Sequence, residues 1–150
     1  MKGRTLAAVL TLLLVLAATG QALRWRNRLT ANRLLGRVEQ LTLAAYRYGQ
    51  APVKLMADNL ETLHRAAPLN PVEVGIPMAR GTQYLFLGRF DTAAAAYQEA
   101  VAFEPQSAGY FALGRAQWLA GRRDEARRNF AVALRLDPSL AAQLPQGVQP

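Results

Sequence analysis

Two stretches near the C-terminus decide the fold: GRFDTAAAAYQEAVAFEP, residues 88–105, and GRRDEARRNFAVALRLDP, residues 121–138. They superimpose at an offset of about 33 residues, and self-similarity at this period indicates stacked helical hairpins. Small and aromatic residues recur at matched places in the two copies. The matched pairs are Gly81 with Gly114, Ala93 with Ala126, Tyr97 with Phe130, and Ala100 with Ala133.

The small residues have a physical role in such a hairpin. Packed helix axes lie about 8–10 Å apart, so a long side chain at Gly114 or Ala126 would push the two helices apart. Phe130 is expected to fill the space beside them, because protein interiors are close-packed. We therefore predict a set of repeat-packing residues: Gly81, Tyr84, Ala93, Tyr97, Ala100, Gly114, Ala126, Phe130 and Ala133.

This pattern resembles the tetratricopeptide repeat (TPR). The second copy has the family's order of large residue, Leu, Gly, Gly, Ala, aromatic, Ala and Pro without a gap, in Tyr110, Leu113, Gly114, Gly121, Ala126, Phe130, Ala133 and Pro138. Gln117 departs from the family, which usually has an aromatic residue there. The resemblance implies an all-α fold, a short TPR-like α-solenoid of antiparallel helix pairs. Two repeats would occupy residues 72–138, and residues 139–150 would form a flexible tail.

The resemblance also implies a partner-binding groove lined by the first helix of each repeat. Chaperone-binding family members clamp a C-terminal carboxylate with lysine, asparagine and arginine, which this sequence lacks at the comparable places. A mostly apolar groove with one arginine fits a partner helix or apolar segment. The alternative is that Phe111 and Trp118 pack on the protein's own tail or on an unseen helix. The expected groove residues are Met78, Thr82, Leu85, Phe86, Phe111, Arg115, Trp118 and Leu119.

The N-terminus predicts a membrane anchor. Residues 5–23, TLAAVLTLLLVLAATGQAL, carry no charge, and a helix of this length extends about 28 Å, near the thickness of a bilayer's hydrocarbon core. We expect residues 1–28 to form an uncleaved transmembrane helix with a basic flank. A cleaved signal peptide, leaving a soluble periplasmic TPR protein, is the alternative. The residues suited to the membrane interface are Arg24, Trp25, Arg26 and Arg28.

The net charge of +8 bears on partners and on orientation. Most of the excess surrounds the apolar N-terminus, which indicates membrane topology and makes a basic nucleic-acid-binding protein the less favoured alternative. The arginines after the apolar segment favour a cytoplasmic domain, whereas its signal-like order favours an extracytoplasmic one. We expect a single-pass protein of a bacterial-type inner membrane, with its domain on the extracytoplasmic side.

Residues 29–71 predict a linking helix pair. Apolar residues recur at spacings of three and four in two windows, which places them on one face of each helix. The spacing of Leu63, Ala66 and Pro71 resembles that of the repeats, with Asn59 where the repeat has Ala93, so the pair is a possible degenerate repeat. The expected faces are Leu34, Val38, Leu41, Ala45 and Tyr48, then Val53, Met56, Leu60, Leu63 and Ala67.

The sequence carries no pattern typical of catalysis or metal binding. It has no cysteine, and its single histidine, His64, lacks companions at metal-ligand spacing. Asp124 and Glu125 fit a helix start better than an acid/base pair. We therefore predict a non-enzymatic membrane-anchored adaptor or scaffold. It would bind another protein, as an accessory subunit of a membrane-associated assembly, with no cofactor, metal or nucleic acid.

Overall fold

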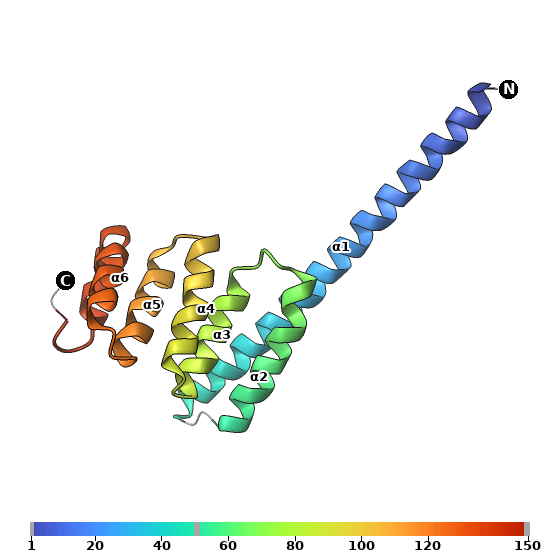
Figure 1. Ribbon diagram of the computed structural model, residues 1–150. Helices are drawn as coiled ribbons and strands as arrows, with labels where there is room; N and C mark the ends of the chain where they lie inside the picture. Colours follow the sequence, from blue (N-terminus) through green and yellow to red (C-terminus); the bar gives the residue numbers. More distant parts are fainter. Residues whose placement is uncertain (1, 50–51, 149–150) are drawn as a thin grey trace.

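A computed structural model describes residues 2–49 and 52–148, with side chains from residue 9 onward. The prediction of an all-α, TPR-like solenoid is confirmed, because every regular element within the described residues is a helix. Neighbouring helices pack as hairpins that stack side by side, and the N-terminal half of α1 projects from the stack (Figure 1). The helices are α1 (Lys2–Arg47), α2 (Val53–Ala66), α3 (Gly75–Phe86), α4 (Phe90–Phe103), α5 (Ser107–Leu119) and α6 (Arg123–Leu136), with 3-10 helices at Ala67–Leu69 and Pro138–Gln143.

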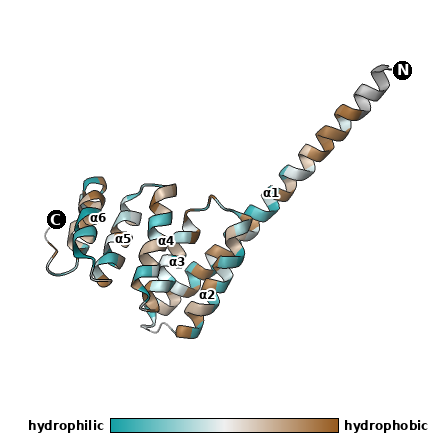
Figure 2. Cartoon of the chain, in the orientation of Figure 1, coloured by the Kyte–Doolittle hydropathy of each residue, from teal (hydrophilic) through white to brown (hydrophobic). Residues whose placement is uncertain are grey.

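The two halves of α1 have different surroundings, although the helix is continuous over 46 residues. In the projecting half, Leu14 is 70% exposed and Leu16 is 58% exposed. Figure 2 shows hydrophobic colouring along this half and hydrophilic residues where α1 meets the stack. In the other half, Ala31, Leu35 and Val38 are buried with residues of α2 and α3. One helix is therefore both a projecting rod and the first member of the stack.

The predicted transmembrane span gains no support from the described residues. Over that part of the chain, no helical stretch is both long enough and apolar enough to cross a membrane. The side chains of residues 5–8, where the predicted span begins, lie outside those that the structure describes.

The buried face of α1 differs from the predicted one. Val38 and Ala45 are buried as expected, but Leu41 and Tyr48 are exposed. Ala31 and Leu35 are buried instead, and the polar residue Thr42 lies between them and Ala45 along the same face. Leu34 is partly buried against the same cluster. Because a polar residue interrupts this stripe, a search for apolar periodicity adds Leu41 and Tyr48, which lie beside the buried face.

A glycine meets an aromatic ring in each of the last two hairpins. A Cβ atom added to Gly81 of α3 would lie 2.5 Å from the ring of Tyr97 on α4. A Cβ atom added to Gly114 of α5 would lie 2.9 Å from the ring of Phe130 on α6. Close approach of these helices therefore requires glycine at both positions. The predicted alanines of the packing set are also buried: Ala93, Ala100, Ala126 and Ala133.

The same turn closes both of these hairpins. Gly88 and Gly121 have φ angles of 70° and 82°, in the left-handed region that favours glycine. The next backbone amide then donates to a carbonyl in the preceding helix, from Arg89 to Tyr84 and from Arg122 to Gln117, both at 2.9 Å. This pattern ends a helix and reverses the chain within three residues, so the next helix returns along the one before it.

Candidate partner-binding groove

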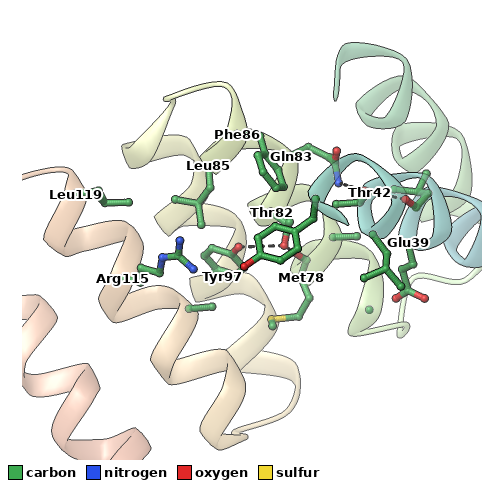
Figure 3. A pocket seen from close by; sticks show the side chains of 16 residues that line it. Glu39, Thr42, Met78, Thr82, Gln83, Leu85, Phe86, Tyr97, Arg115 and Leu119 are labelled. Carbon is green, nitrogen blue, oxygen red and sulfur yellow. Dashed lines mark hydrogen bonds between the residues drawn. The ribbon is translucent and has the colours of Figure 1, made fainter. Parts of the chain in front are cut away.

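A groove of about 600 Å³ runs across α1, α3 and α5, the first helices of the three hairpins (Figure 3). Tyr97 of α4, a buried side chain, contributes to its floor. The lining is mostly apolar, with Glu39 and Arg115 as its acidic and basic residues. The remaining lining residues are Val38, Thr42, Leu43 and Tyr46 of α1, Gly75, Met78, Ala79, Thr82, Gln83, Leu85 and Phe86 of α3, and Ala112 and Leu119 of α5.

The structure brings six of the eight predicted groove residues together. Phe111 and Trp118 lie elsewhere. The ring of Phe111 packs against Phe130, with centroids 5.3 Å apart, and the guanidinium of Arg123 lies 3.7 Å from the Trp118 ring centroid. These two side chains contact α6 because residues seven apart share one helical face, and this face is turned toward the partner helix of the hairpin. The six that line the groove are Met78, Thr82, Leu85, Phe86, Arg115 and Leu119.

The wall contributed by α1 was missed from the sequence. Glu39, Thr42, Leu43 and Tyr46 all line the groove. The similarity of residues 29–71 to the repeats could have indicated this wall. If these residues form a first repeat, its first helix lies along the groove beside the first helices of the other two.

A hydrogen-bonded pair of hydroxyl groups lies at the floor of the groove. The hydroxyl oxygens of Tyr97 and Thr82 are 3.2 Å apart, and either group can donate. Burial raises the pKa of Tyr97 above its ordinary value, against smaller lowering effects of the Thr82 hydrogen bond and the positive charge of Arg115. Tyr97 is therefore neutral at physiological pH and already has a hydrogen-bond partner within the groove.

A buried polar cluster fixes the α1 wall to α3. The Asn59 side chain, 2% exposed, donates from Nδ2 to Gln83 Oε1 at 3.1 Å and to Thr42 Oγ1 at 3.4 Å. Gln83 Nε2 donates to Thr42 Oγ1 at 2.9 Å, and the Thr42 hydroxyl donates to the carbonyl of Val38 at 2.7 Å. Three helices thus share one network, which sets the position of one side of the groove.

The groove offers no arrangement for catalysis by a metal ion. Within the described residues, no group of three or more His, Cys, Asp or Glu side chains could hold one. The expectation that the protein is not an enzyme stays a prediction. The groove can bury an apolar surface of another molecule, and Glu39 and Arg115 can each pair with a charge of opposite sign on it.

Comparisons with known proteins place the fold. No family model and no curated protein matches the sequence. The second TPR of Spaghetti (RPAP3), bound to the HSP90 peptide SRMEEVD, matches with a TM-score of 0.63 at 18% identity, over 75% of this chain and 96% of that one. The OM64 TPR domain of Arabidopsis matches with a TM-score of 0.64 at 22% identity, over 75% and 87% of the two chains.

A bacterial structure matches as well. The thermophilic TPR protein TTC0263 of Thermus thermophilus has a TM-score of 0.64 at 27% identity, over 81% of this chain and 63% of that one. These neighbours share the stacked helical hairpins seen here, and all three are described as TPR domains or proteins. The described part of the chain, apart from the projecting half of α1, therefore has the fold of a TPR domain.

Proposed function

We propose that this protein is a non-enzymatic adaptor whose groove binds an apolar segment of another protein. The observation that carries this proposal is the apolar groove of about 600 Å³ across α1, α3 and α5. Phe86 and Leu119 on its walls are 39% and 46% exposed. Covering such side chains is favourable by roughly 25 cal/mol per Å² of apolar surface removed from water.

The likeness to a peptide-bound TPR domain supports this use of the groove. The second TPR of Spaghetti is bound to an acidic HSP90 peptide. That specificity is not transferred here, because Met78, Thr82 and Ala112 line the groove at places comparable to those where a carboxylate clamp has lysine, asparagine or arginine. The proposed ligand is instead a segment that offers apolar side chains.

Two pairs of matched substitutions test the groove. Phe86→Asp and Leu119→Asp place a charge in it, whereas Phe103→Asp and Leu136→Asp alter side chains that are 53% and 54% exposed and do not line it. The variants are purified from whole cells lysed in mild detergent, and co-purifying proteins are quantified by mass spectrometry. We expect the groove variants to lose a partner by about tenfold or more, since anchor residues dominate binding energy. Equal recovery with all four variants would refute the proposal.

We further propose that the projecting half of α1 holds the domain at a membrane, as an accessory subunit of a membrane-associated assembly. Val9, Leu12 and Leu14 of this half are each more than half exposed, and an apolar surface of this kind favours a lipid or protein partner. Trp25, 64% exposed, lies between Arg24 and Arg26 in the sequence, a combination that suits the membrane interface. Gln21, Arg24, Trp25 and Arg28 together line a hollow of about 170 Å³.

The proposed location is a bacterial-type inner membrane, with the TPR domain on the extracytoplasmic side. Fractionation with carbonate washing tests attachment, and Leu13→Asn combined with Leu16→Asn is expected to release the protein. Intact mass separates anchoring from cleavage, since removal of a leader would lower the mass by about 2 kDa. Protease digestion of spheroplasts tests the side. Recovery of the full-mass wild-type chain in the soluble fraction would contradict membrane attachment.

A further inference from the structure

Two charges of opposite sign lie at opposite ends of the groove. Arg115 of α5 projects beside Leu85 and Leu119, and Glu39 of α1 lies at the other end (Figure 3). Both are exposed, and neither forms an ion pair within the described residues. Arg80 provides a contrast, because it pairs with Glu99 at 2.9 Å on the same stack. The groove therefore presents an apolar surface between an unpaired cation and an unpaired anion.

We propose that the groove's occupant is an amphipathic helix with a basic residue at one end of its apolar stripe, facing Glu39, and an acidic residue at the other, facing Arg115. This inference rests on the proposed function of the groove and names the chemistry of the partner. Glu39 and Arg115 lie on either side of α3 along the groove, so at helix spacings of about 8–10 Å they are roughly 16–20 Å apart. At about 1.5 Å per residue, a spacing of about 11 residues covers roughly 16 Å and is close to three full turns, so it places the occupant's two charges on the same face as its apolar stripe.

The charges decide which occupants the groove accepts. While the groove is open, water solvates both side chains. An ion pair that stayed exposed to water would contribute little to the binding free energy. Once an occupant covers them, a charge left without a partner is strongly unfavourable, so uncharged or wrongly charged helices are rejected. The Tyr97 hydroxyl already has Thr82 Oγ1 as a hydrogen-bond partner at 3.2 Å. The Arg115 guanidinium thus remains free to bind a carboxylate with two parallel hydrogen bonds.

A second copy of this chain is a poorer occupant. Its exposed apolar segment, residues 9–23, has no charged residue. Docked in the groove, this segment would cover Arg115 without offering it an acidic partner, since the first acidic residue of the chain is Glu39. Charge complementarity therefore favours a separate protein.

Four synthetic helical peptides test the inference. Each has about 18 residues and the same leucine stripe, and the two positions that flank the stripe, 11 residues apart, carry Lys and Glu, Lys and Lys, Glu and Glu, or Gln and Gln. Titration calorimetry measures their binding to the full-length protein in mild detergent. We expect the Lys and Glu peptide to bind about tenfold more tightly than the other three, with the difference shrinking at high salt.

Charge reversal in the protein makes the test specific. Arg115→Glu should shift the preference to the Lys and Lys peptide, and Glu39→Lys to the Glu and Glu peptide. The double variant exchanges the two charges, so it should prefer a peptide with the order of Lys and Glu exchanged over the original Lys and Glu peptide. Both residues are exposed, so the folding of each variant can be verified by an unchanged thermal melt.

The other possible outcomes distinguish a failure of this inference from a failure of the proposed function. Equal binding of all four peptides, or preferences that do not follow the charge reversals, would overturn this inference and leave the groove's role intact. No binding by any peptide, combined with unchanged partner recovery in Phe86→Asp, would overturn the proposed function as well. Self-association that Phe86→Asp abolishes would identify a second copy as the occupant and also overturn the inference.

Discussion

The first hairpin and the two that follow bring their helices together by different means. In α3–α4 and α5–α6, glycine packs against an aromatic ring, Gly81 against Tyr97 and Gly114 against Phe130. In α1–α2, Asn59 occupies the interior and donates hydrogen bonds to its neighbours. The two later hairpins share a steric fit between glycine and an aromatic ring, to which α5–α6 adds hydrogen bonds from Gln117 to Glu125 and from Asn129 to Gln117. The first combines apolar contacts with hydrogen bonds, one of which reaches Gln83 in the next hairpin.

This difference has a consequence for the groove. A glycine–aromatic contact holds two helices of one hairpin and is complete without its neighbours. The polar cluster joins α1 and α2 to α3, so the α1 wall of the groove is positioned by the second hairpin. Breaking the two kinds of contact should therefore have different effects on stability.

The largest effect is expected at the steric contact. Gly114→Leu places a side chain where even a Cβ would lie 2.9 Å from the Phe130 ring and 3.2 Å from the Ala126 carbonyl oxygen. Because Phe130 is fully buried and the oxygen belongs to the backbone, neither can yield easily. We expect the free energy of unfolding to fall by about 3 kcal/mol. Urea unfolding of the full-length protein in mild detergent measures it.

Gly36 provides the matched control on α1. A Cβ there would meet nothing within 4 Å. Gly36→Ala should therefore raise stability by up to about 1 kcal/mol, because alanine favours helix more than glycine does. A thermal melt of Gly114→Leu that moved by only a degree would contradict the packing role of Gly114.

A smaller loss is expected at the polar contact. Asn59→Ala gives the first hairpin the residue type of Ala93, but it leaves Gln83 Oε1 buried without its donor. We expect the free energy of unfolding to fall by about 2 kcal/mol, since an unsatisfied buried polar group is costly. The same urea titration measures the change. A neutral result would show that the cluster does not stabilise the first hairpin.

A double-mutant cycle isolates the hydrogen bond from the lost packing. Gln83→Leu removes the acceptor, so Asn59→Ala should cost about 1 kcal/mol less in that background than in the wild type. Additive losses would mean that packing alone explains the effect of Asn59→Ala. Gly114→Leu lies in another hairpin and should add to either change without coupling.

The sequence predicted the later hairpins well because their contacts are repetitive. Gly81 and Gly114 recur with their aromatic partners at one offset, and the turn glycines Gly88 and Gly121 recur with them. Steric fit of this kind requires particular residue types at fixed spacing, so it is visible without coordinates. The resemblance to the TPR, which rests on this spacing, also implied that Leu85 and Leu119 line a groove, and both do.

The first hairpin could not be predicted so well because its contacts depend on residues distant in sequence. Thr42 and Gln83 are 41 positions apart, and no spacing rule links them. Since Thr42 is polar, it also interrupts the apolar pattern by which the buried face of α1 would be recognised. The groove wall on α1, to which Thr42 belongs, was missed for the same reason. Phe111 and Trp118 show a different limit, because aromatic type alone does not tell whether a side chain faces the groove or the partner helix.

The smallest effect is expected where the two repeats differ by one hydroxyl. Tyr97→Phe gives the first copy the ring type of Phe130 and removes a hydroxyl whose oxygen lies 3.2 Å from Thr82 Oγ1. We expect a loss of about 1 kcal/mol in the free energy of unfolding at neutral pH, the usual net contribution of one hydrogen bond. Urea unfolding at about pH 8 measures it, below the ordinary pKa of tyrosine.

Alkaline pH should reduce that difference. Burial raises the pKa of Tyr97 in the folded protein above 10.0, so the unfolded chain loses this proton first as pH rises. The wild type therefore keeps its full stability below about pH 10 and loses part of it above, whereas the phenylalanine ring of the variant cannot titrate. Between about pH 8 and pH 11 the wild type should lose more stability than Tyr97→Phe. Tyr46→Phe, at a side chain 73% exposed, should lose as much as the wild type. Equal losses in all three proteins would mean that the Tyr97 hydroxyl is not buried in the groove floor.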